Sequence, residues 1–199
     1  MENNKIVSLV GLSVLLGLVS GFVSEYVSLK SLIFVLPGLF LGVSICIMLK
    51  FVLKVKQSTK QYLLFIVLSL VAYYMSLISG SISLYMSFML ENVPFEILSY
   101  INDLIASLVG AIGICLSFAI FKFQFKRENI IIIIVSVLVT LLTLLVMPEE
   151  IFTNRGALIQ TTLWQGAIMG CLAYFILKKI QKENYIQINQ VNSTTTSSM

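Results

Sequence analysis

The chain has 199 residues, of which 58% are hydrophobic and 11% are charged, and its formal net charge is +4. Soluble domains carry about 25% charged residues, so the composition excludes a water-soluble globular protein and predicts an integral membrane protein. The basic residues lie between apolar segments, which indicates orientation in the bilayer rather than binding of nucleic acid.

Six apolar stretches, each long enough to cross a bilayer as a helix, follow one another along the chain. They cover approximately residues 6–23, 32–53, 62–89, 98–121, 130–147 and 157–177. Only helices and closed barrels satisfy the backbone in lipid, and these stretches lack the alternating polarity of barrel strands. We therefore predict an all-α integral membrane fold: a six-transmembrane-helix bundle within residues 1–182 and a polar, disordered cytoplasmic tail at 183–199.

The basic residues predict the orientation of this bundle. With six spans, all but Lys30 and Arg155 of the thirteen lysines and arginines fall on one side. Basic residues resist translocation, so we expect that side to be cytoplasmic, with both termini inside (N-in/C-in), in the plasma or inner membrane of the cell.

Pairs of segments have similar sequences. Residues 17–29 and 76–88 share Ser, Gly and Tyr at a fixed offset, and 110–126 and 166–182 share Gly, Cys and Lys. These matches raise the hypothesis of three repeated helical hairpins. The alternative is the general compositional similarity of membrane helices, and the sequence leaves both interpretations open.

Small and hydroxyl residues recur at spacings of three and four along several spans, which places them on one helical face. Small side chains there let helix backbones approach closely. The residues predicted to pack helices are Gly17, Gly21, Ser24, Ser76, Gly80, Ser83, Gly110, Gly166 and Gly170. A polar-lined cleft for a solute is the alternative interpretation of this pattern.

Polar side chains also gather toward the predicted outer end of the later spans. The candidate substrate-binding residues are Glu91, Glu96, Asn102, Asp103, Gln160, Trp164 and Gln165. Acidic groups at this end, including Glu25 in the first outer connection, could form a mouth for a cation, and solvated loop charge is the alternative. No charged residue lies near a predicted midplane, which argues against an independent proton-coupled pump.

Catalytic and metal-binding patterns are missing from the sequence. The chain has no histidine, and its three cysteines form no C-x-x-C pair. We therefore predict no catalytic residue, no metal site and no cofactor, and expect that the protein is not an enzyme.

Two functions fit this sequence. The first is a small-molecule uptake or binding subunit with an outward-facing site, for a substrate that the sequence does not identify. In size, span number and topology the chain resembles the substrate-binding components of energy-coupling-factor vitamin transporters, although no motif carries the similarity. The second is a non-transporting scaffold or assembly factor whose basic cytoplasmic face docks a protein partner or anionic lipid. Both reside in the lipid bilayer.

Overall fold

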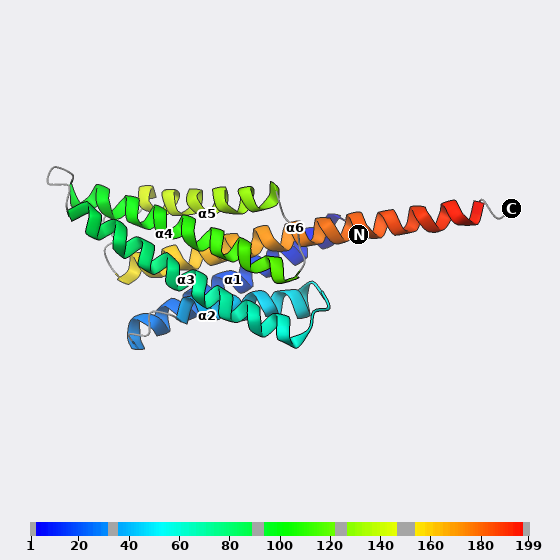
Figure 1. The fold of residues 1–199 in the computed structure, drawn as a ribbon, viewed down its shortest axis with the longest axis horizontal. Coiled ribbons are helices and arrows are strands. Elements are labelled where there is room, and N and C mark those ends of the chain that lie inside the picture. The colour runs from blue at the N-terminus through cyan, green and yellow to red at the C-terminus, as the bar shows by residue number, and fades with distance from the viewer. Residues whose placement is uncertain (1–2, 32–35, 89–93, 122–126, 147–153, 197–199) are drawn as a thin grey trace.

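The structure, a computed structural model, describes residues 3–31, 36–88, 94–121, 127–146 and 154–196 (Figure 1). In chain order the elements are α1 (Asn3–Ser31), α2 (Leu36–Ile47), the π-helical turn η1 (Met48–Val52), α3 (Thr59–Phe88), α4 (Phe95–Ser117), the 3-10 turn η2 (Phe118–Phe121), α5 (Arg127–Val146) and α6 (Asn154–Thr196). No strand occurs in these ranges, so the predicted all-α bundle is confirmed for the part of the chain that the structure describes.

Several helices have the length and apolarity of membrane spans. Four segments are long and apolar enough to cross a membrane, namely Asn4–Val27, Thr59–Ile82, Tyr100–Phe121 and Arg127–Val146. The apolar helix Leu36–Val52 is shorter, and α6 carries Gln160 and Gln165 within its apolar stretch. Large apolar side chains on the outside of the bundle, such as Leu142 at 60% exposed, suit contact with lipid. These features indicate a multi-pass membrane protein, and the number of six spans stays a prediction.

The bounds of α2 follow from its local sequence. Pro37 occupies the first turn, where a proline costs no helical hydrogen bond. At the other end, the Leu53 N–H donates to the Met48 carbonyl at 2.8 Å, and Lys54 adopts a left-handed φ of 54°. A residue in this conformation stops a helix, so α2 and η1 together end before the lysine-rich connection to α3.

Consecutive helices run in opposite directions, so the two ends of the bundle differ in charge (Figure 1). α1, α3 and α5 begin at one end, and α2 and α4 finish there; we call it the basic end. Nine of the described basic residues belong to this end: Lys5, Lys50, Lys54, Lys56, Lys60, Arg127, Lys178, Lys179 and Lys182. Lys30, near the end of α1, and Arg155, near the start of α6, belong to the opposite end. α2, α4 and α6 begin at the opposite end. The side of the membrane that each end faces stays a prediction from charge.

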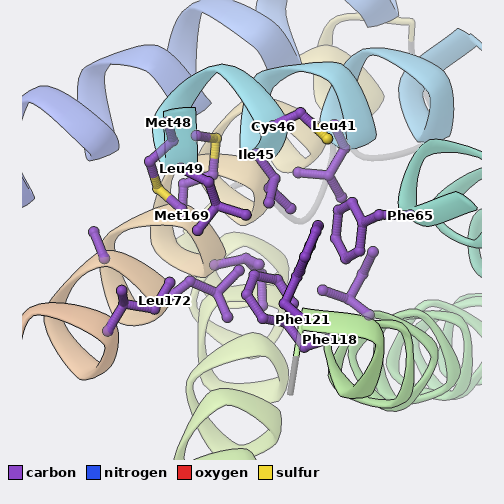
Figure 2. Close-up of a cluster of buried hydrophobic side chains, with 14 of the residues drawn as sticks. Leu41, Ile45, Cys46, Met48, Leu49, Phe65, Phe118, Phe121, Met169 and Leu172 are labelled. Atoms are coloured by element: carbon purple, nitrogen blue, oxygen red, sulfur yellow. The ribbon is translucent and has the colours of Figure 1, made fainter. Parts of the chain in front are cut away.

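An apolar core joins α2, α3, α4 and α6 toward the basic end, as Figure 2 shows. The rings of Phe65 and Phe118 meet edge-on with centroids 5.1 Å apart, and Phe121 lies 5.0 Å from Phe65. Met169 and Leu172 of α6 close the other side of this cluster and are fully buried. Edge-on aromatic pairs add to the packing energy, so this half of the bundle is densely filled.

The tail differs from its predicted form. Residues 183–196, expected to be disordered, continue α6 as a helix that projects from the bundle (Figure 1). Extending an existing helix needs no new nucleation, because each added residue joins a turn that is already formed.

Candidate functional site

A cavity of about 250 Å³ lies in the half of the bundle away from the apolar core, and all six described α-helices contribute to its wall. Its polar and aromatic lining residues are Glu25, Ser69, Tyr73, Ser76, Asp103, Ser107, Thr140, Gln160, Thr161, Trp164 and Gln165. Leu41 and Ile114 also line the cavity and belong to the apolar core. The cavity is therefore polar along its wall and bounded by apolar packing toward the basic end.

Gln165 holds three helices together at the cavity wall. Its Oε1 accepts a hydrogen bond from the Ser20 hydroxyl at 2.9 Å, and its Nε2 donates to the Pro37 carbonyl at 3.1 Å. The side chain is 1% exposed. Because both ends of the amide are paired with α1 and α2, Gln165 positions these helices around the cavity rather than offering a free group to a ligand.

Trp164 makes an equivalent connection on the other side. Its indole N–H donates to the hydroxyl of Ser107 at 3.1 Å and also to that of Ser136, and the two serine hydroxyls lie 2.9 Å apart. This network ties α6 to α4 and α5. The indole ring, which lines the cavity, is thus fixed in orientation by its polar edge.

Close contact between α1 and α6 lies next to the cavity, which Glu25 of α1 and Gln165 of α6 line. A Cβ atom placed on Gly17 would lie 2.6 Å from the Gln165 carbonyl oxygen, and one on Gly21 would lie 2.6 Å from the Thr162 Cα. On α6, a Cβ on Gly166 would meet Leu18 and one on Gly170 would meet Val14, each at 2.6 Å. At Gly17 and Gly21 the atoms met belong to the backbone of α6, so only glycine permits this approach, which is how small residues pack membrane helices.

The remaining packing candidates make ordinary contacts or lie elsewhere. A Cβ on Gly80 or Gly110 would stand 3.4 Å from its nearest neighbour, a normal van der Waals distance. The Ser76 hydroxyl donates to the Ala106 carbonyl across α3 and α4 at 2.6 Å, whereas Ser24 bonds within its own helix to the Gly21 carbonyl. The side chain of Ser83 lies outside the described residues.

The structure brings together four of the seven predicted substrate-binding residues. Asp103, Gln160, Trp164 and Gln165 all line the cavity. Asn102 does not; its Oδ1 is buried without a hydrogen-bond partner, near Gly80 on α3. Of the remaining two, Glu91 lies outside the described residues, and the side chain of Glu96 also lies outside them.

Glu25 lines the cavity but was not among the predicted substrate-binding residues. Sequence analysis placed it in a connection after the first span, but α1 continues to Ser31 and buries Glu25 to 8% exposure on the cavity wall. The Thr161 side chain hydrogen-bonds its carboxylate, and Tyr73 lies close enough to interact with its charge. The signal that could have found it is the spacing of Gly21 and Glu25, which puts the carboxylate on the α6-facing side of α1.

The hydroxyl residues of α4 and α5 were also missed. Ser107 and Thr140 line the cavity, and Ser136 bonds to Ser107 from the adjacent helix. Ser136, Thr140 and Thr143 are all buried and follow the spacing of four and three that marks one helical face. This spacing is present in the sequence, but none of these hydroxyl residues was among the predicted packing or substrate-binding residues.

Among the residues described, no group of three or more His, Cys, Asp or Glu side chains could hold a metal ion. The Cys46 thiol instead donates to the Tyr62 carbonyl at 3.7 Å, and that of Cys115 to the Asn129 carbonyl at 3.9 Å. These two thiols act as small buried side chains with weak donors.

Comparison with known proteins gives this chain no relative: no protein-family model, no curated protein and no solved structure matches it.

Proposed function

We propose that this protein is a membrane-embedded binding subunit that takes up a small polar solute in the cavity between its helices, without chemically transforming it. The observation that carries the proposal is a cavity of about 250 Å³ with a polar wall inside an otherwise apolar bundle. Polar and ionisable groups inside membrane helices are costly, and they commonly mark substrate pathways.

The shape of the interior favours a binding site over an open channel. Phe65, Phe118 and Phe121 fill the bundle between the cavity and the basic end. A solute in the cavity would meet this aromatic core and could continue only after a rearrangement. In the orientation that the charge pattern predicts, the cavity belongs to the outer half of the membrane, as expected for a subunit that captures a solute from outside.

Filling the cavity tests this proposal. Gly110 lines the cavity, and a Cβ there would stand 3.4 Å from the Ser76 hydroxyl and 3.5 Å from Trp164, so a leucine would occupy the space between them. Gly11 is the matched control, because nothing lies within 4 Å of a Cβ at that exposed position. Both variants and the parent protein would be purified in mild detergent, and small molecules that co-purify would be identified by mass spectrometry.

The parent and Gly11→Leu should retain a bound solute that Gly110→Leu has lost. Absence of any stoichiometric small molecule from the parent, or its retention by a folded Gly110→Leu variant, would overturn the proposal. Folding is checked independently by circular dichroism and gel filtration.

A second function has support at the basic end. A groove along α2, η1 and the start of α3 is lined by Lys50, Lys54 and Lys56 and by apolar side chains such as Val43 and Ile66. The lysines suit the head group of an anionic lipid, and the apolar side chains suit its acyl chains. Binding of such a lipid would be one form of the docking function expected for the basic face. Replacing the three lysines by glutamine should abolish preferential retention of anionic over zwitterionic lipid in native mass spectrometry; an unchanged lipid profile would contradict this function.

A further inference from the structure

Two carboxylates from different helices line the cavity: Glu25 from α1 and Asp103 from α4. Glu25 is 8% exposed, and its Oε2 atom is buried without a hydrogen-bond partner. The hydrogen bond with Thr161 therefore leaves an acceptor oxygen unused on the cavity wall.

The described lining of the cavity supplies no positive charge to compensate these carboxylates. Among the described residues that line it, none is a lysine or arginine. An ionised carboxylate that is buried without a counter-charge destabilises the folded protein. A bound cation would supply the missing partner, because opposite charges in a poorly polarisable interior attract strongly.

The rest of the wall suits an organic cation better than a bare metal ion. Tyr73 and Trp164 contribute aromatic rings, whose faces attract cations, and Leu77 adds an apolar surface. A hard metal ion prefers a shell of six or more oxygen ligands, whereas here two carboxylates lie among aromatic and apolar groups. The volume of about 250 Å³ also greatly exceeds the ~10–15 Å³ that a single water molecule needs.

We infer that the ligand of the cavity is a small organic cation, a protonated amine or a quaternary ammonium ion. Its charge lies against Glu25 and Asp103, and its carbon skeleton lies against Trp164 and Tyr73. This inference rests on the proposed function and adds the chemical class of the solute.

The stability of the ligand-free protein gives a first test. Replacing Glu25 with glutamine keeps an acceptor for Thr161 and removes the unpaired charge. Glu25→Gln should therefore melt at or above the temperature of the ligand-free parent, because a residue retained for binding is unfavourable when the site is empty. Glu128→Gln, the same change in the first turn of α5 at the basic end, is the control. A Glu25→Gln variant that folds but melts well below the parent would assign Glu25 a structural role and overturn the inference.

Ligand binding gives the second test. Purified protein in detergent would be titrated with n-butylammonium and tetramethylammonium chlorides, with n-butanol and sodium butanoate as neutral and anionic analogues, and with sodium chloride alone. At least one ammonium ion should raise the melting temperature in a saturable manner, and the other solutes should not. Glu25→Gln and Asp103→Asn should each weaken that ammonium binding by about tenfold or more, as loss of a charge-assisted contact predicts, while Glu128→Gln should not.

The possible outcomes distinguish failure of the organic-cation inference from failure of the proposed binding function. Saturable binding of butanol or butanoate, equal stabilisation by sodium chloride, or no response to any probe would overturn the assignment to organic cations. A co-purifying neutral or anionic solute that Gly110→Leu displaces would leave the binding function intact while refuting its cationic ligand. Absence of any bound solute from the purified parent protein, together with no response to any added probe, would refute both.

Discussion

Replacing Gly21 with alanine tests whether the close contact between α1 and α6 sets the stability of the bundle. A Cβ at Gly21 would lie 2.6 Å from the Thr162 Cα and 2.9 Å from the Thr161 carbonyl oxygen, and both atoms belong to the backbone. Since ordinary contact begins near 3.4 Å, the helices would have to separate by about 0.8 Å at this point. A backbone atom cannot rotate away as a side chain does, so the strain spreads along the interface.

The expected magnitude follows from two opposing terms. Overpacking of this kind costs about 1–3 kcal/mol, and the better helix propensity of alanine returns about 0.5–1 kcal/mol. Gly11→Ala on the same helix isolates the packing term, because a Cβ at Gly11 meets nothing within 4 Å. The propensity gain is common to both variants, so Gly21→Ala should be less stable than Gly11→Ala by about 1–3 kcal/mol.

The free energy of unfolding of both variants and the parent would be measured by titration with sodium dodecyl sulfate in mixed micelles, followed by circular dichroism. Gly17→Ala, whose Cβ would lie 2.6 Å from the Gln165 carbonyl oxygen, should behave like Gly21→Ala. If Gly21→Ala proves as stable as Gly11→Ala, the two backbones do not meet at this position and the described contact between α1 and α6 is wrong.

Three further predictions concern the core, the tryptophan network and the topology. Phe118→Ala should lower the free energy of unfolding by about 2 kcal/mol, which is less than in a soluble protein because lipid already solvates the side chain in the unfolded membrane state. Leu142→Ala on the exposed surface should change this free energy little, and equal losses for the two variants in micelle unfolding would contradict the core assignment. Trp164→Phe should cost about 1 kcal/mol in the same assay through loss of its indole hydrogen bonds, and a variant as stable as the parent would show that the network contributes nothing. With the native cysteines replaced by alanine, Lys56→Cys should resist an impermeant thiol reagent in intact cells and Glu149→Cys should react, and labelling in the reverse pattern would invert the orientation.

The sequence predicted the fold class and part of the cavity because polar residues are informative in an apolar chain. Asp103, Gln160, Trp164 and Gln165 stood out since lipid-facing positions rarely carry such side chains. Their roles did not follow from the sequence: both ends of the Gln165 amide are bound to neighbouring helices, which only the tertiary arrangement reveals.

Glu25 shows why hydropathy is a poor guide to helix ends. An apolar run ends where polarity rises, at about residue 23, whereas α1 itself continues to Ser31 because its backbone hydrogen bonds are indifferent to side-chain polarity. Contact with α6 then buries a carboxylate that the sequence assigns to a connection.

The sequence also did not show which helices pack against each other. Gly21 and Gly80 occupy matching positions in the two similar segments, yet Gly21 lies against α6 and Gly80 against α4. Membrane helices present apolar residues to lipid and to one another alike, so a stripe of small residues indicates that a face packs without naming the helix that it meets.

Trp164, hydrogen-bonded to its two serines, is also an intrinsic fluorescent probe of the cavity. Trp164 is the only tryptophan of the chain, and its ring lies on the cavity wall. Indole emission responds to the polarity around the ring and to hydrogen bonding at its N–H, which here is held by Ser107 and Ser136. Any solute that displaces water from the ring should shift or quench this single emission band, so occupancy can be followed in the unlabelled protein in real time.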